Sequence, residues 1–284
     1  NHLKLGCIFC HYLSDKIKGY LLGAIIGGAL LSLFVWFFTF AGNNFWWYAW
    51  ILFSMFTLFF TMFYTSLIVP IFNKLQPLET GSLREKIEAF AQKVSFPLTN
   101  IFVIDGSKRT TKANAYFSGL GSKKTIVLFD TLINEQSEDE LVSVLAHEVG
   151  HYKMKHIQKG MIIGVLQMGV LLFILSLFIN KPALTQALGL QTDVPVFHLG
   201  LIAFSLLYSP FSMITGIFMN ILSRKNEFEA DNYAKEHTGT GEHLITALRK
   251  LSANNLSNLN PNKWYVFFHY SHPPLLERVR NLMK

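Results

Sequence analysis

Two histidines and a glutamate lie in the stretch AHEVGH with the spacing of a metal site. On a helix, four residues correspond to a rotation of about 400°, so His147 and His151 would point to one side and share one ion. Glu148 would be turned by roughly 100° from His147, where it can reach a water on the metal without being a ligand. Imidazole nitrogen is a good zinc ligand, and a catalytic site holds three protein ligands and one open position. The stretch therefore predicts one catalytic zinc ion per chain.

A third ligand must come from elsewhere in the chain. His156 lies nine residues beyond His147, about half a turn around a continuous helix, so we expect it to face away from the metal as a surface histidine. The metzincin pattern would have glycine at position 154 and histidine at position 157, where this chain has Met154 and Ile157. That class of metalloprotease is excluded, and a glutamate on a second helix is the remaining route.

Acidic residues are scarce, 18 in all, and the stretch NEFEADNYAKEH places two of them at i and i+4. Glu227 would complete a His₂Glu ligand set, and Asp231 would accept the second N–H of a ligand histidine and so fix its tautomer. The alternative is an acidic helix face in solvent, which describes Glu229 and Glu236 better. We expect this helix to end near Gly239.

The helix that carries the two histidines has a recognisable start. Ser137 and Glu140 form the pattern S-x-x-E, a capping box, so the helix should begin there. Upstream, residues 83–94 have apolar side chains at helical spacing and predict another helix.

Strands are expected between these two helices. Residues 100–106 are typical of a short strand, and the apolar runs 114–117 and 125–129 predict a hairpin around Gly-rich and Lys-rich turn residues. The edge of such a hairpin could lie open to an extended peptide, which would add itself as another strand. A hairpin without a ligand fits these residues equally well.

Composition places the whole chain in a membrane. It has 284 residues, of which 51% are hydrophobic and only 15% are charged. A helix of about 18 or more apolar residues can cross a hydrocarbon core of roughly 30 Å. Four stretches meet this condition, at 20–41, 46–69, 161–179 and 197–222.

The basic residues indicate how these spans are oriented. Of the 25 Lys and Arg residues, Lys181 alone lies between the first and second spans or between the third and fourth. Because loops rich in Lys and Arg stay in the cytoplasm, the remaining segments should be cytosolic. The net charge of +7 then reflects topology and contact with anionic lipid. No motif of a nucleic-acid reader accompanies it, so we expect no nucleic-acid partner.

Five segments follow from the spans and the charges. They are an N-terminal flank at 1–19, two spans within 20–69, a cytosolic catalytic segment with the HExxH helix at 70–160, two spans within 161–222, and a second cytosolic catalytic segment at 223–284.

One further pattern, CIFCH, matches the attachment motif of c-type haem. Haem attachment needs the exported face, whereas the charges put Cys7 and Cys10 in the cytoplasm, and no second pair completes a Cys₄ zinc site. We expect ordinary reduced thiols.

Four separated motifs resemble the type I CAAX prenyl proteases, which are integral-membrane zinc metalloproteases. The motifs are AHEVGH, NEFEADNYAKEH, the hairpin stretch TKANAYFSGLGSKKTIVLFDTLI and the tail HYSHPPLLERVRNL. The resemblance runs from about Lys16 to the C-terminus, with the motifs in order. The heat-shock membrane proteases share HExxH and ExxxD but lack the SHPPLLER tail.

The resemblance implies a mainly α-helical integral membrane protein. Its transmembrane bundle would enclose a chamber capped by a zincin-like catalytic domain with a small β-hairpin or sheet, and the site would open to the cytosol. Family members have seven spans where four are visible here, which is the expectation for a chain shortened at its N-terminus.

The resemblance also carries over site residues. His147, His151 and Glu227 match the zinc ligands, and Glu148 matches the general base. Two residues of the tail match groups that line the site and stabilise the reacting group, namely His272 and Arg278. Four residues at the start of the hairpin match the edge along which substrate lies: Asn114, Ala115, Tyr116 and Phe117.

The implied substrates are proteins or peptides that end in Cys-a-a-X with a prenyl group on the cysteine, cut to release aaX. The prenyl chain would find an apolar wall beside the membrane. The location would be the endoplasmic reticulum membrane of a eukaryote or the inner membrane of a bacterium. Two alternatives stay open: a membrane quality-control zinc protease that acts on unprenylated membrane proteins, and a non-catalytic membrane scaffold.

Overall fold

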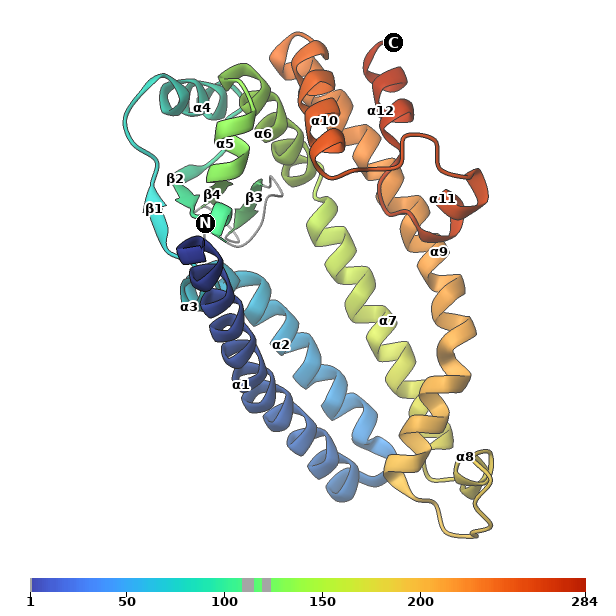
Figure 1. Ribbon diagram of the computed structural model, residues 1–284. Coiled ribbons are helices and arrows are strands. Elements are labelled where there is room, and N and C mark those ends of the chain that lie inside the picture. Colours follow the sequence, from blue (N-terminus) through green and yellow to red (C-terminus); the bar gives the residue numbers. More distant parts are fainter. Residues whose placement is uncertain (1, 109–114, 119–123) are drawn as a thin grey trace. The chain divides into compact units, whose positions relative to one another are not determined.

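The computed structural model describes residues 2–108, 115–118 and 124–284 (Figure 1). The chain divides into two compact units. Unit 1 comprises Asn1–Lys16, Phe60–Ile157 and Met219–Lys284, and unit 2 comprises Ile17–Phe59 and Gln158–Phe218.

The four expected membrane helices are present. Their apolar parts cover Tyr12–Ala41, Phe45–Tyr64, His156–Phe178 and Phe197–Thr238. They belong to helices α1 (His2–Ala41), α2 (Phe45–Leu67), α7 (His156–Phe178) and α9 (Phe197–Thr238).

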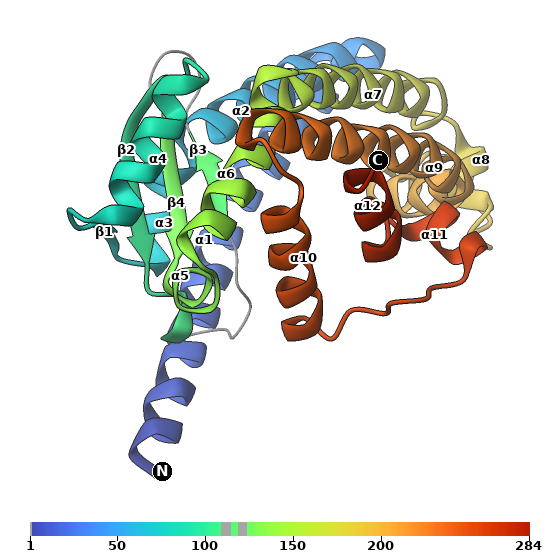
Figure 2. The ribbon, with the colours of Figure 1, turned by 90° about the horizontal axis from the view of Figure 1, so that it is seen from above.

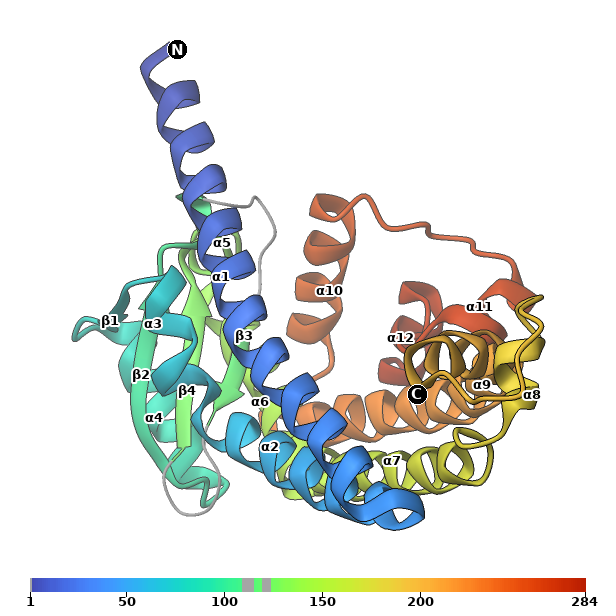
Figure 3. The same ribbon diagram turned by 90° about the horizontal axis from the view of Figure 1, so that it is seen from below.

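Unit 2 is built from these apolar helices. The short 3₁₀ turn η1 (Gly42–Asn44) joins α1 to α2, which runs back antiparallel to it (Figures 1 and 3). The turn is tight because Gly42 adopts a φ of 54°, which costs glycine little. Helix α7 is followed by the short α8 (Pro182–Gln186). The buried core of this unit combines side chains from α1, α2 and the end of α7: Phe34, Phe45, Ala49, Leu172, Leu175 and Ile179.

Unit 1 contains a sheet of four strands in the order β1-β2-β4-β3. The strands are β1 (Leu75–Pro77), β2 (Leu98–Ile104), β3 (Ala115–Ser118) and β4 (Lys124–Phe129). Strands β2 and β4 are parallel, whereas β1 with β2 and β3 with β4 are antiparallel. The predicted hairpin is confirmed, since Ala115 lies opposite Leu128 and Ser118 opposite Thr125. Among the described strands, β3 occupies one edge of the sheet.

Alternating side chains of β4 point to opposite faces of the sheet and are buried on both. Ile126 and Leu128 point to the face covered by helices α4 (Ser82–Lys93), α5 (Asp130–Glu135) and α6 (Glu138–Lys153) (Figures 1 and 2). Val127 points to the opposite face and packs with Val69 of the short helix α3 (Val69–Phe72). This period of two is the pattern of a strand buried on both faces.

Helix α6 begins where the capping box predicts. The Ser137 hydroxyl accepts the backbone N–H of Glu140, and the Glu140 carboxylate accepts the backbone N–H of Ser137 at 2.7 Å. The same carboxylate accepts a 2.6 Å bond from Lys250 of α10 (Glu242–Asn254). One buried glutamate therefore fixes both the start of the histidine helix and the helix that packs beside it.

The helix that carries Glu227 and Asp231 is continuous with the fourth membrane span. The stretch expected to form the second helix of the site belongs to α9, which runs on from the fourth span for 42 residues in all. It ends at Thr238, as expected, because Gly239 adopts a φ of 83°. The acidic pair therefore sits on a rigid element.

The two helices of the candidate site approach each other closely at Gly150. A Cβ atom placed there would lie 3.1 Å from the Cα of Ala230 and 3.1 Å from the Cβ of Tyr233. Ala230 and Ala234 on the facing side of α9 are fully buried. Small residues on both helices therefore set the separation between the histidines of α6 and the carboxylates of α9.

We predict that Gly150→Val lowers the free energy of unfolding by about 1–3 kcal/mol, because the added methyl groups must push α9 away. Chemical denaturation of the protein in detergent measures this change. Gly160→Val is the matched control, since a Cβ at Gly160 meets no atom within 4 Å. Equal stability of the two variants would contradict the packing argument.

Candidate active site

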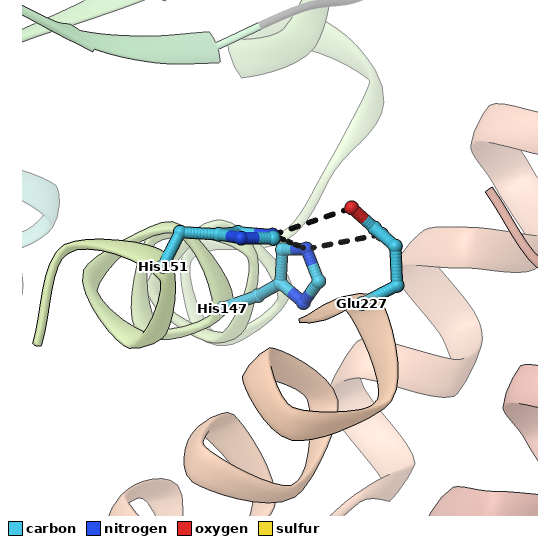
Figure 4. A group of neighbouring side chains, drawn as sticks. All are labelled: His147, His151 and Glu227. Atoms are coloured by element: carbon cyan, nitrogen blue, oxygen red, sulfur yellow. Dashed lines mark hydrogen bonds and ion pairs between the residues drawn. The ribbon is translucent and has the colours of Figure 1, made fainter. Parts of the chain in front are cut away.

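His147, His151 and Glu227 converge on one point from two helices (Figure 4). The Nε2 atoms of the two histidines lie 3.2 Å apart. The Glu227 carboxylate approaches from α9, with Oε2 3.5 Å from Nε2 of His147 and Oε1 3.3 Å from Nε2 of His151. The structure thus brings together the three residues expected to hold a metal.

These separations fit tetrahedral coordination. A zinc ion with bonds of about 2.0–2.1 Å to nitrogen and oxygen has tetrahedral edges of about 3.3 Å. The two Nε2 atoms lie 3.2 Å apart, His151 Nε2 lies 3.3 Å from Glu227 Oε1 and His147 Nε2 lies 3.5 Å from Glu227 Oε2, all close to that value. Glu227 Oε2 is also buried and has no hydrogen-bond partner within the described part of the chain. A carboxylate that faces two imidazole nitrogens is a donor set that suits zinc.

Asp231 holds one of these histidines in place. Nδ1–H of His147 donates to Asp231 Oδ1 at 2.9 Å, which leaves Nε2 free to face the shared point. Asp231 is fully buried one helical turn after Glu227. The geometry is the one expected for a carboxylate that fixes the tautomer of a metal ligand.

Arg278 of α12 (Leu275–Leu282) engages the same carboxylate. Its Nε donates to Asp231 Oδ2 at 2.9 Å and its Nη2 donates to Oδ1 at 2.6 Å, a bidentate pair. Its Nη1 lies 3.4 Å from Glu227 Oε2. These contacts hold the carboxylates of Asp231 and Glu227 in place, and the expected role of Arg278 in stabilising the reacting group stays a prediction.

His272 lies in the loop between α11 (Lys263–His269) and α12. Its side chain is 66% exposed, and its Nε2 is 3.4 Å from Glu227 Oε1. The Ser271 hydroxyl lies 2.9 Å from the other ring nitrogen. His272 therefore approaches the Glu227 carboxylate from the exposed side of the site.

A cavity of about 150 Å³ joins these groups. Its walls include His147, Glu148, Glu227, His272 and Arg278, and also Ala115 of the edge strand β3. Of the four residues expected along the substrate edge, Ala115, Tyr116 and Phe117 form β3, and Asn114 lies outside the described residues. The edge strand β3 and the predicted metal ligands His147 and Glu227 therefore border one cavity.

Comparison with known proteins decides the family. A model of peptidase family M48 matches residues 77–284, and a model described as "CAAX prenyl protease N-terminal, five membrane helices" matches residues 9–74. The chain belongs to peptidase family M48. Membership implies a metal ion, and the four apolar helices together with the second match make this M48 chain an integral membrane protein.

Relatives agree with this assignment. The M48 chain is 40% identical over 275 residues to the CAAX prenyl protease 1 homolog of Dictyostelium discoideum. The alignment covers 96% of this chain and 64% of the relative. It is 36% identical over 286 residues to CAAX prenyl protease 1 of Saccharomyces cerevisiae. This alignment covers 95% of the M48 chain and 63% of the relative. The chain thus spans less than two thirds of the length of these curated relatives.

A solved structure supports the fold. The crystal structure of Ste24p from S. mikatae matches the M48 chain with a TM-score of 0.90 at 35% sequence identity. The match covers 97% of this chain and 67% of that one.

The charges around the M48 site shift two pKa values. Burial alone would lower the pKa of His147, but its hydrogen bonds to Asp231 and Glu227 raise it to about 9. A metal must therefore displace a proton from this ring at neutral pH, so metal affinity should increase as pH rises toward 9. Burial raises the pKa of the Glu148 carboxyl above its ordinary value.

His156 corrects one of our expectations. We predicted a surface histidine that faces away from the site, but His156 is only 5% exposed and its Nδ1 lies 3.1 Å from Nδ1 of His151. The prediction assumed a continuous helix, whereas α6 ends at Lys153 and Lys155 adopts a φ of 60° before α7 begins at His156. A non-glycine residue in the left-handed region gives no clear signal in the sequence.

Proposed function

We propose that this chain is a membrane zinc endopeptidase that removes the aaX tripeptide from prenylated CAAX proteins or peptides. The observation that carries the proposal is the convergence of His147, His151 and Glu227, because His147 and Glu227 line one cavity with Glu148 and with Ala115 of the edge strand β3. Relatives named CAAX prenyl protease 1 support the substrate class.

His147, His151 and Glu227 would hold one zinc ion. When bound, zinc lowers the pKa of water and polarises the scissile carbonyl. Glu148 would take the proton from the attacking water and return it to the nitrogen of the leaving peptide. His272, which is exposed and lines the cavity, would donate a hydrogen bond to the oxygen of the former carbonyl, a contact worth roughly 3 kcal/mol in known hydrolases.

Strand β3 would bind the substrate backbone. An extended peptide can pair with an edge strand of a sheet, and Ala115 of β3 lines the cavity with Glu148. Such pairing would hold the scissile bond beside the ligand set with little dependence on side chains. The prenyl group would then supply the selectivity by entering an apolar environment.

The distribution of Lys and Arg supports a cytosolic site. Unit 1, which contains the ligand set, includes residues 70–157 and 223–284 and thus most of the basic residues outside the spans. The protein would lie in the endoplasmic reticulum membrane of a eukaryote or in the inner membrane of a bacterium, with this unit in the cytosol.

The decisive test uses two peptides that differ only in a farnesyl group on the CAAX cysteine. Mass spectrometry should detect release of aaX from the farnesylated peptide by detergent-purified protein, and little release from its twin. Equal cleavage of both peptides would instead favour a quality-control protease of broader range. A zinc-loaded protein that cleaves neither would overturn the proposal and favour a scaffold.

A further inference from the structure

We propose that His156 and Glu229 are positioning residues for the metal ligand His151. This inference rests on the proposed metal site. It assigns a role to a buried histidine that the proposed reaction leaves unused. The series of contacts starts at the proposed metal position, passes through His151 and His156, and ends at Glu229.

The distances define this series of contacts. Nδ1 of His151 lies 3.1 Å from Nδ1 of His156, and the two rings meet edge to face with centroids 5.1 Å apart. On the far side of its ring, Nε2 of His156 lies 3.0 Å from Glu229 Oε2. The His156 side chain is 3% exposed, whereas that of Glu229 is 37% exposed.

The backbone break after α6 makes these contacts possible. On a continuous helix, His156 would lie about 180° from His147. The left-handed turn at Lys155 ends that helix and starts α7 at His156, so the ring returns toward His151. Glu229 reaches His156 from α9, two residues beyond Glu227.

Metal binding would fix the position of each proton shared by His151, His156 and Glu229. If Nε2 of His151 binds the metal, its proton must lie on Nδ1 and be donated to His156. Nδ1 of His156 must then be the acceptor, which places the proton of that ring on Nε2. Nε2–H of His156 donates to the Glu229 carboxylate. Each group thus has one role, and His151 is held in the tautomer and orientation that binding needs.

The two ligand histidines are therefore supported differently. His147 donates directly to Asp231, which is fully buried and paired with Arg278. His151 reaches its carboxylate through an intervening imidazole, and that carboxylate is partly exposed. Removing the intermediate ring should loosen His151 while Asp231 still supports His147.

The test is zinc affinity, measured by competition with a chelator of known affinity. We expect His156→Leu to raise the zinc dissociation constant by about 10-fold to 100-fold, as for other residues that orient a ligand. His156→Asn should recover part of the loss, because its side-chain oxygen can accept the N–H of His151. His243→Leu is the matched control, since His243 is exposed on α10.

Two further measurements separate positioning from folding. Cobalt substituted for zinc should show an altered visible spectrum in His156→Leu, while the melting temperature of the metal-free variant stays close to that of His243→Leu. If His156→Leu fails to fold, Glu229→Ala tests the same series of contacts from a partly exposed position, and we expect a several-fold rise in the zinc dissociation constant.

The outcomes distinguish this inference from the proposed function. If Glu227→Ala leaves zinc binding intact, the metal site itself is wrong. If Glu227→Ala abolishes binding but His156→Leu and Glu229→Ala bind zinc like the unaltered protein, the site stands and the positioning role is overturned. An unchanged cobalt spectrum in a folded His156→Leu would also overturn it.

Discussion

Replacing Glu148 by glutamine is expected to lower the turnover number for peptide hydrolysis by about 100-fold to 10,000-fold. The amide keeps the size and most of the hydrogen bonds of the side chain but cannot take a proton from water. Glu148 lines the cavity but is not one of the three converging ligands, so zinc content should not change. The measurement is turnover of the farnesylated peptide at saturating concentration, together with zinc per chain.

Glu236→Gln is the control for this change. It removes the same charge from an exposed position on α9 and should leave turnover unaltered. Full activity of zinc-loaded Glu148→Gln would exclude Glu148 as the general base. Loss of zinc from that variant would instead mean that Glu148 contributes to the ligand set.

The second large effect concerns the buried pair of Asp231 and Arg278. Asp231→Leu leaves the Arg278 guanidinium without its bidentate partner in a buried position. Removing one partner of a buried ion pair typically costs about 3–5 kcal/mol. We therefore expect the free energy of unfolding of the metal-free protein to fall by about this amount, measured by denaturant titration in detergent.

The double variant Asp231→Leu, Arg278→Met separates the stability of the pair from its role at the site. Replacing both charges with apolar groups of similar size should restore most of the lost stability. Zinc affinity should stay about 10-fold to 100-fold weaker, because His147 no longer donates to a carboxylate. Recovery of wild-type zinc affinity in the double variant would contradict the role assigned to Asp231.

Much of the site could be predicted because its spacing is local. His147 and His151 share a helix face, as do Glu227 and Asp231, and helical periodicity alone places each pair. The capping box at Ser137 likewise acts within one turn. Hydropathy alone gave the four membrane helices, since each must be long and apolar to cross a bilayer.

The remaining parts depend on contacts between distant segments. No local pattern shows that Arg278 pairs with Asp231 across 47 residues of sequence. His156 was misplaced because the left-handed residue Lys155 ends a helix that the periodicity continued. The length of α9 could not be predicted either, because a change from apolar to charged residues marks the end of a membrane span but not the end of a helix.

The most direct test of the metal site is X-ray absorption spectroscopy at the zinc edge of the purified protein. We predict a first shell of nitrogen and oxygen atoms at about 2.0–2.1 Å with outer scattering from two imidazole rings, and loss of this signal in Glu227→Ala. A sulfur shell at about 2.3 Å would contradict this account and point to Cys7 and Cys10 as the ligands.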